Sequence, residues 1–455
     1  MQFVADPHLH SKYSRAVSPN MVLSIMAQFA KKKGIDILAT GDWTHPLWLR
    51  EIKSQLEEKS EGLFQLKSQI PASPRGEPNP KSETLFILST EISSIYSQGG
   101  KVRRVHNLIL SPSLETCEKI NQELGKKGCN LHSDGRPIIG LSSKNLLELV
   151  LSINEKALFI PAHVWTPWFS LYGSNSGFDS IEECFGDYSK FIYAVETGLS
   201  SDPSMNWRIK ELENRSIISS SDSHSPAKMG REATVFELEK ASFENIRKGI
   251  MKTEGKSNRI MYTIEFYPEE GKYHYSGHRN CKIVQDPLET KEKGIICPSC
   301  HKPLTLGVMH RVEKLADPLL SKDPLNKLNS LGIKWFGDPK NIHPPFVKLV
   351  PLLEIVAESL SSTVFSQKVK DCFDSLCEKF GSEINVLLKT KEEDVEKDFG
   401  RKIAEGVAKA RSGNIVISPG YDGEYGKVKI WPEEEEQKDL KVQKEFRKKD
   451  QLGLF

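Results

Sequence analysis

The chain has 455 residues, with 63 Lys and Arg against 61 Asp and Glu, so its formal net charge is +2. This length predicts two to four domains. The near-neutral net charge gives no sign of a nucleic-acid partner, although a local basic patch would still allow one. Because the chain has eight cysteines, no apolar run that could span a bilayer and no visible signal peptide, we expect a reduced, cytoplasmic protein with no membrane contact.

Residues 1–264 alternate short apolar runs with helix-like segments, and we expect them to form one catalytic domain of α/β class. Gly34 suits the C-cap of the first helix. The predicted segments are helices over 22–33, 46–68 and 142–153 and strands over 192–195 and 233–238. A proline-rich stretch at about 70–83 is expected to be a mobile insertion loop.

The pattern changes at about residue 265. Aromatic residues, Gly and Cys cluster over 265–310, where we expect a small zinc-binding module. Residues 311–431 are predicted to be a helical domain that ends in a β-hairpin, with Asp422-Gly423 as its turn signal. The remaining residues, 432–455, are mostly charged and are expected to form a flexible tail.

Several apolar runs in the catalytic domain end in side chains that can bind metals. Imidazole and carboxylate are ligands that zinc, manganese and iron accept. Short strands that alternate with helices and carry a ligand at the C-terminal end predict a barrel with its active site at that end. The segments are 6–10, 41–45, 90–91, 162–163 and 221–224, and His106 stands at the start of a further run.

The spacing of these ligands predicts a centre with more than one ion. His8 and His10 alternate along one strand end, so both imidazoles can converge on one ion. Glu91 can bridge two ions because a carboxylate has two oxygens. Asp222 and His224 repeat the alternating geometry on a late strand.

His106 and His163 are placed for a second ion. Clustered cations lower the pKa of a bound water and stabilise both oxygens of an in-line displacement, which suits hydrolysis of phosphate esters. The residues expected to act directly in catalysis are Asp222, His8 and Glu91. A single-zinc deaminase is disfavoured, because no His-x-Glu and Pro-Cys-x-x-Cys pair occurs in the barrel.

A second metal site is predicted in the zinc-binding module. Two short knuckles, each with two residues between its ligands, are a strong signal for tetrahedral zinc. The expected ligands of this structural zinc are His278, Cys281, Cys297 and Cys300. His274 and His301 are competing ligands, and the alternative is that the residues are unrelated and buried.

In combination, the motifs over residues 1–260 resemble the PHP (polymerase and histidinol phosphatase) family. The resemblance implies a distorted seven-stranded βα barrel with two or three divalent ions, which would be zinc, manganese or magnesium. The ligands it implies are His8, His10, Asp42, Glu91, His106, His163, Asp222 and His224. The chain departs from the family where Trp43 follows Asp42 and where Arg15 and Ala16 follow the first motif.

Over nearly the whole chain, to about residue 430, the sequence also resembles the endonuclease Q family of DNA repair nucleases. The matching segments are 162–170, 174–178, 196–203, 221–228, 277–279, 304–308 and 419–423. The resemblance implies cleavage of the phosphodiester on the 5′ side of a deaminated base (uracil, hypoxanthine or xanthine) or an abasic site in damaged DNA. A phosphatase of small phosphate esters remains the alternative, and a non-enzymatic DNA-binding or clamp-associated adaptor is disfavoured by the nearly complete ligand set.

Recognition of a damaged base usually requires its extrusion from the stack, and aromatic rings can assist. The rings expected to contact substrate are Trp165, Trp168 and Phe169, and the alternative is that they pack the barrel mouth. Lys228 and Arg231 are expected to meet phosphates, against the alternative of an inert exposed pair.

The last five residues resemble the peptide by which bacterial proteins bind the replication sliding clamp. The residues expected to contact the clamp are Gln451, Leu452, Leu454 and Phe455. The charged tail would act as a tether, and the alternative is an apolar terminus with no partner. We expect the protein to be a monomer.

Overall fold

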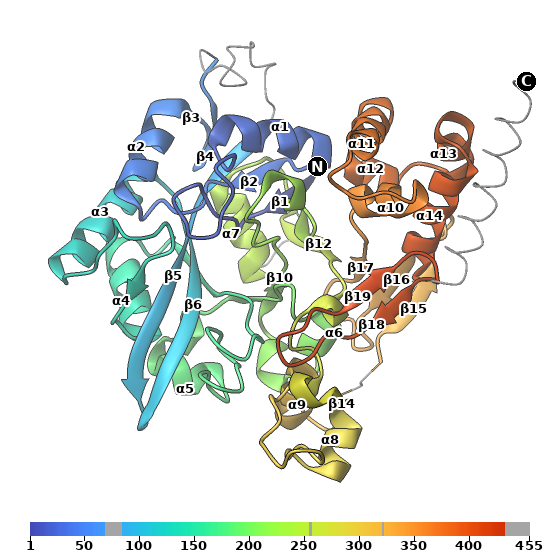
Figure 1. The fold of residues 1–455 in the computed structure, drawn as a ribbon. Helices are drawn as coiled ribbons and strands as arrows, with labels where there is room; N and C mark the ends of the chain where they lie inside the picture. Colours follow the sequence, from blue (N-terminus) through green and yellow to red (C-terminus); the bar gives the residue numbers. More distant parts are fainter. Residues whose placement is uncertain (69–83, 254–256, 321–322, 433–455) are drawn as a thin grey trace, which may run out of the picture.

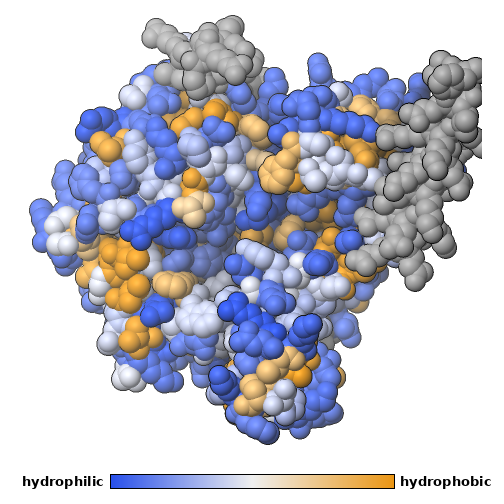
Figure 2. Space-filling model, viewed as in Figure 1, coloured by the Kyte–Doolittle hydropathy of each residue, from blue (hydrophilic) through white to orange (hydrophobic). Residues whose placement is uncertain are grey.

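A computed structural model describes residues 1–68, 84–253, 257–320 and 323–432 (Figure 1). The expected insertion at about 70–83 and the clamp-binding residues 451–455 lie outside these ranges. Among the described helices, none is both long enough and apolar enough to cross a membrane. Figure 2 shows that the face in view is mainly hydrophilic, with hydrophobic residues in several separate patches.

The catalytic part is a mixed α/β structure around a large sheet. Its strands are β1 (Gln2–Asp6), β2 (Ile37–Ala39), β3 (Leu56–Ser60), β4 (Leu63–Leu66), β5 (Leu85–Gln98), β6 (Lys101–Ser111), β7 (Ile138–Ile139), β8 (Leu158–Pro161), β11 (Ala233–Glu237) and β12 (Arg259–Glu265). Strand β2 pairs in parallel with both β1 and β5, whereas β11 lies antiparallel to β1, and β6 antiparallel to β5 and β8. Parallel pairing places the C-terminal ends of β1 and β2 side by side, and β5 continues past them to Gln98.

Strands β9 (Ala194–Glu196) and β10 (Ser216–Ile218) form a separate two-stranded parallel sheet. The backbone N–H of Val164 donates to the carbonyl of Glu196 at 3.1 Å, which connects the end of β8 to β9. The N–H of Ser219 donates to Oγ1 of Thr234 at 2.9 Å, which connects the end of β10 to β11. The strand ends therefore surround one mouth, while the seven-strand count of the barrel stays a prediction.

Helices cover the strands of this part, and their capping follows the sequence. The helices are α1 (Leu23–Lys33), α2 (Pro46–Gln55), α3 (Leu114–Lys126), α4 (Ser143–Ile153), α5 (Ile181–Phe185), α6 (Pro203–Asn206) and α7 (Phe243–Met251). Helix α1 ends at Gly34 as predicted, with φ of 85°. Ser142 caps α4 by accepting a hydrogen bond from the N–H of Asn145, also as predicted.

The expected charged helix over residues 46–68 is wrong in its second half. Helix α2 stops at Gln55, and the chain then forms the β3–β4 hairpin around Gly62, which has φ of 69°. Strand β4 continues the sheet by pairing with β5, through Leu63 and Phe64. Pairing with the sheet and burial of these two side chains outweigh the helical preference of the charged residues.

The C-terminal half contains the predicted zinc-binding module, more of the sheet and a group of helices. Its elements are β13 (Ser276–His278), β14 (Ile283–Gln285), α8 (Pro287–Lys293), α9 (Val308–Leu315), β15 (Leu325–Leu328), β16 (Lys334–Gly337), β17 (Phe346–Lys348), α10 (Leu352–Ser359), α11 (Gln367–Phe380), α12 (Glu383–Leu388), α13 (Glu392–Phe399), α14 (Arg401–Ser412), β18 (Val416–Ser418) and β19 (Lys427–Lys429). The predicted terminal hairpin is confirmed as β18–β19, with positive φ at Asp422 and Gly423.

The region expected to be helical also holds three strands. Strand β17 pairs in parallel with β12, and β16 and β15 follow it, so the central sheet continues beyond residue 264. A buried ion pair of 2.6 Å between Lys33 on α1 and Glu383 on α12 joins the helical group to the catalytic part. The helices α11 and α12 contact α1 and lie beside it in Figure 1.

Candidate metal centre and zinc module

Two ligand-bearing segments lie side by side at the mouth of the strands. The N–H of Asp222 donates to the carbonyl of His8 at 3.0 Å, and the N–H of His10 donates to the carbonyl of Ser223 at 3.1 Å. Leu9 between the two histidines is buried in the core. The alternation of side chains along extended backbone therefore turns both imidazoles toward Asp222, as the sequence predicts.

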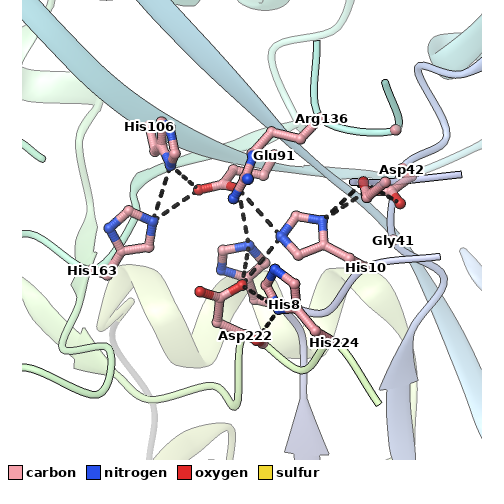
Figure 3. A network of polar contacts seen from close by, with 12 residues as sticks. His8, His10, Gly41, Asp42, Glu91, His106, Arg136, His163, Asp222 and His224 are labelled. Carbon is pink, nitrogen blue, oxygen red and sulfur yellow. Dashed lines mark hydrogen bonds and ion pairs between the residues drawn. The ribbon is translucent and has the colours of Figure 1, made fainter. Parts of the chain in front are cut away.

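The candidate ligand atoms form three groups, and within each group all atoms lie within 4.8 Å of one another (Figure 3). The groups are His8, His10 and Glu91; His10, Asp222 and His224; and Glu91, His106 and His163. Glu91 and His10 each belong to two groups. The two oxygens of Glu91 could bind different ions, whereas Nε2 of His10 would bind one, because Nδ1 faces Asp42. Seven of the eight predicted ligands are thus brought together.

Buried polar atoms without a hydrogen-bond partner show whether this site fits metal ions. Nε2 of His8, Nε2 of His10 and Oδ1 of Asp222 are buried and make no hydrogen bond among the described residues. Nε2 of His10 lies 3.1 Å from Oδ1 of Asp222 and 3.3 Å from Oε2 of Glu91. Buried polar atoms without partners are costly, and a divalent cation would satisfy all three at once. The donor set fits zinc or manganese.

Two carboxylates behind the centre orient its first histidines. Nδ1 of His8 lies 3.0 Å from Glu196, and Nδ1 of His10 lies 2.9 Å from Oδ1 of Asp42. A carboxylate on Nδ1 fixes the tautomer and the ring direction, and leaves Nε2 free to bind an ion. Glu196 was not predicted as a site residue, although it follows a strand-like run just as the ligands do.

Asp42 was expected to bind metal, and the structure corrects this expectation. Its second oxygen, Oδ2, accepts hydrogen bonds from the backbone N–H of Ser11 at 2.6 Å, from the Ser11 hydroxyl at 2.7 Å and from the Ser14 hydroxyl at 2.9 Å. With Oδ1 on His10, both oxygens have partners, and Asp42 belongs to none of the three ligand groups. Asp42 is a positioning residue for His10.

Arg136 enters the centre from the loop between α3 and β7, and no sequence pattern pointed to it. Its Nη1 lies 3.2 Å from Oε2 of Glu91. The guanidinium is partly exposed, whereas the Glu91 carboxylate is fully buried. A guanidinium cation therefore lies beside Glu91, one of the predicted metal ligands (Figure 3).

The pKa values of the cluster follow from burial and from the neighbouring charges. Burial alone would lower the pKa of His8, but the carboxylates of Glu196 and Glu91 raise it well above its usual range. Burial would raise the pKa of Glu91, but His106 and Arg136 hold it well below its usual range. A ligating imidazole must be neutral, so divalent ions and protons compete for His8.

The zinc-binding module brings the four predicted ligands together. The ligand atoms of His278, Cys281, Cys297 and Cys300 lie within 4.8 Å of one another. Burial disfavours the Cys297 thiolate, but backbone N–H groups of Cys300 and Ser299 lower the pKa of this thiol to about 6. A thiolate is the form that binds zinc, so this donor set fits one tetrahedral ion.

The competing histidines lie outside this group. His274 is buried against the ring of Tyr275, with ring centroids 5.0 Å apart. His301 is exposed and follows the last cysteine in a left-handed conformation, with φ of 59°. Among the described residues, His278 is therefore the histidine that joins the three cysteines.

Similarity to solved structures shows which family this chain belongs to. The lesion-specific endonuclease PfuEndoQ from Pyrococcus furiosus matches with a TM-score of 0.77 and 31% identity, over 95% of this chain and 96% of that one. The chain belongs to the endonuclease Q family. A complex of endonuclease Q with a 27-mer duplex, whose abasic lesion lies at the active site, matches with a TM-score of 0.78 and 31% identity, over 95% and 98% of the two chains.

Two further comparisons match parts of this chain. Residues 351–414, which span α10 to α14, match the family model of the MJ0043 C-terminal domain. The uncharacterized protein MJ0043 of Methanocaldococcus jannaschii is 33% identical over 279 residues, which are 60% of this chain and 32% of that protein. This chain therefore matches about a third of the length of that relative.

In this endonuclease Q family member, the aromatic residues after His163 divide into two sets. Trp165 is fully buried, its indole N–H donates to Oδ1 of Asn206 at 2.8 Å, and its ring lies 4.8 Å from that of Tyr172. The expectation that Trp165 contacts substrate is therefore wrong, because its ring packs in the core. A run of aromatic residues does not reveal in advance which rings face solvent.

The other two predicted rings are partly exposed beside the centre. Phe169 has φ of 64°, and its ring lies 5.0 Å from that of His106. Trp168 meets Tyr273 of the zinc-binding module edge to face, with ring centroids 5.3 Å apart. Their expected role in substrate binding stays a prediction, which their position beside a metal ligand supports.

The predicted basic pair is also split. Lys228 is exposed. Arg231 is partly buried, and its Nε and Nη2 donate to the carbonyl of Ser221 at 3.0 and 2.9 Å. Arg231 thus holds the backbone next to Asp222, which itself has φ of 45°. The guanidinium is engaged in positioning the turn that carries two candidate ligands, so the alternative of an inert exposed pair does not describe it.

Proposed function

We propose that this protein is a metal-dependent endonuclease that cleaves DNA on the 5′ side of deaminated bases and abasic sites. The observation that carries the proposal is the set of three ligand groups that share Glu91 and His10. The similarity to endonuclease Q structures over 95% of the chain supports DNA as the substrate class, since one of them holds a duplex with an abasic lesion. We further propose that the surrounding strands correspond to the PHP barrel.

The proposed ions would be held by the seven grouped side chains, and when bound they would activate a water and stabilise charge on the phosphate. The protein's own contribution is orientation. Asp42 and Glu196 direct the imidazoles of His10 and His8, so the site is arranged before substrate arrives.

Arg136 is placed to meet the substrate. When ions occupy the groups around Glu91, the Arg136 guanidinium will be surrounded by positive charge, so binding of an anion beside Arg136 becomes favourable. A phosphodiester oxygen supplies that charge, and the planar guanidinium can bind it through two N–H groups. We assign Arg136 a role in binding the phosphate at the cleaved bond.

A small-ester phosphatase is the second candidate, and it uses only the catalytic part. The similarity to endonuclease Q includes the zinc-binding module and the C-terminal helices, which such an activity does not require. The two functions differ in the substrate that they need. The phosphatase would be favoured if the protein hydrolysed small phosphate monoesters but left lesion-containing DNA uncut.

The test is to incubate the protein with end-labelled duplexes that contain one uracil, one hypoxanthine or one abasic site, and to map the product. We expect one cut on the 5′ side of the lesion and none in the undamaged duplex. Arg136→Ala should reduce the cleavage rate by at least about tenfold, as loss of a charge-stabilising group does. Equal cutting of damaged and undamaged duplexes would contradict lesion specificity, and no cutting with any metal would contradict the nuclease.

A further inference from the structure

The zinc-binding module and the terminal hairpin together present an exposed aromatic residue next to a lysine. Tyr425, in the loop between β18 and β19, is 70% exposed. The ammonium of Lys272, from the start of the module, lies 4.4 Å from the centre of the Tyr425 ring. We infer that Tyr425 and Lys272 form a contact surface for the DNA backbone and bases outside the metal centre, an inference that rests on the proposed function.

The loop that carries Tyr425 is fixed from both sides by the module. The N–H of Gly423 donates to the carbonyl of Lys272 at 2.9 Å, and the N–H of Gly426 donates to the carbonyl of Glu270 at 3.1 Å. A side chain at Gly426 would place its Cβ 2.1 Å from the Glu269 carbonyl, so only glycine permits this approach. The exposed ring therefore stands on a rigid support.

The zinc ligands take part in this support. Oδ2 of Asp422 accepts a hydrogen bond from the backbone N–H of Arg279 at 2.7 Å, and Arg279 lies between the zinc ligands His278 and Cys281. Oδ1 of Asp422 accepts from the hydroxyl of Thr305 at 2.5 Å. A zinc ion bound by these ligands would therefore hold the turn that precedes Tyr425. The module would then fix the hairpin without taking part in DNA cleavage.

Ring contacts connect this support to the metal centre. Tyr273, the residue after Lys272, packs edge to face on Trp168, with ring centroids 5.3 Å apart. Trp168 belongs to the loop that follows the metal ligand His163. A strand whose phosphate lies at the metal centre therefore has a nearby aromatic and cationic surface along which it can continue.

The chemistry of the pair selects nucleic acid as the occupant. An exposed tyrosine ring can stack on any base, and a neighbouring ammonium can pair with a phosphate. The loop is held in place, so the ring loses little conformational entropy when it binds. Phe365 is 81% exposed in the connection between α10 and α11. It lies outside the zinc-binding module and serves as the matched control.

The test measures binding of a fluorescent duplex, undamaged or with one abasic site, by anisotropy with calcium in place of catalytic metals. Tyr425→Ala should weaken binding of both duplexes by at least about fivefold, whereas Tyr425→Phe and Phe365→Ala should bind like the wild type. Lys272→Gln should lower the slope of log Kd against log salt by about one. Zinc content and circular dichroism check that each variant is folded.

The outcomes separate this inference from the proposed function. Equal affinity of Tyr425→Ala and wild type would overturn the inference, even if the wild type cuts lesion DNA. A wild type that binds DNA through Tyr425 but leaves every lesion uncut would overturn the proposed function alone. A wild type with no affinity for either duplex would overturn both.

Discussion

The carboxylate of Asp42 lies 2.9 Å from Nδ1 of His10, and this contact directs Nε2 of the same ring toward Asp222 and Glu91. The two residues come from the ends of neighbouring parallel strands, β1 and β2. The relationship shows that the centre has an outer layer of carboxylates. It also gives the first test of how the centre is organised.

Asp42→Asn should weaken metal binding without removing a ligand. The substitution removes the charge behind His10 and places an amide N–H₂ where the N–H of Ser11 now donates, or against His10. We expect metal affinity to fall by roughly 10- to 100-fold, measured by competition with a chromogenic chelator. Excess metal should restore cleavage.

The matched control for this prediction is Asp371→Asn. Asp371 lies on α11, where its carboxylate accepts a hydrogen bond from Gln367 at the surface. This variant should keep the wild-type metal affinity. If Asp42→Asn also binds metal as the wild type does, the orienting role of Asp42 is wrong.

Cys297→Ser should release about one zinc equivalent from the purified protein. A hydroxyl does not replace a thiolate on zinc, and the site supplies much of the folding free energy of a small module. Inductively coupled plasma analysis gives the stoichiometry, and limited proteolysis over 265–310 reports the loss of order. Unchanged zinc content would show that the four residues do not form a site. Cys372→Ser, on α11 and away from the group, is the control.

The stability of the protein should depend on pH through Glu265. Burial raises the pKa of Glu265 to about 8, from an ordinary value of 4.5. The folded state therefore favours the protonated carboxyl, and stability from this group is complete below pH 4.5 and is lost as pH rises through 8. Glu265→Gln should remove this loss.

Chemical denaturation at pH 5 and at pH 8 measures the effect. The wild type should lose stability relative to Glu265→Gln by roughly 1 kcal/mol per pH unit across that window. Glu239→Gln, with an exposed carboxylate, is the control. Parallel curves for wild type and Glu265→Gln would show that the carboxyl is already ionised in the folded protein at pH 5.

The clamp contact stays a prediction that a peptide can test. A peptide of residues 446–455 should bind a bacterial sliding clamp, because Leu454 and Phe455 can fill apolar pockets as anchors. Replacement of both by Ala should remove binding in a fluorescence titration. No binding of the unchanged peptide at high micromolar clamp would refute this reading, and the proposed nuclease activity would be unaffected.

Most of the ligand positions could be predicted from sequence because they follow a strand, whereas Glu91 and His106 lie within β5 and β6. Parallel strands end at one edge, so ligands as far apart as His8 and Asp222 meet without any knowledge of the loops. The difference between a ligand and its support could not be predicted. Asp42 and Asp222 both follow strands, and only the direction of their oxygens separates an orienting carboxylate from a candidate metal ligand.

Other features depend on tertiary contacts that leave little trace in a single sequence. Arg136 stands in a loop without a motif, and its role follows from where that loop lies. Trp165 and Trp168 are three residues apart, yet one ring is buried and the other is partly exposed. The segment 46–68 has charged residues that favour a helix, but pairing with β5 turns its second half into a hairpin.

The most direct test of the account is metal-restored cleavage of a duplex with one abasic site. Wild type and Asp222→Asn are stripped with chelator, checked for fold by circular dichroism, and given zinc or manganese in steps. The wild type should be inactive when stripped and should recover one cut on the 5′ side of the lesion when metal is added. Asp222→Asn should stay inactive, because the substitution removes the negative charge of a carboxylate whose buried Oδ1 has no hydrogen-bond partner among the described residues. Cleavage by the stripped protein, or equal recovery in Asp222→Asn, would contradict the metal centre as the site of the reaction.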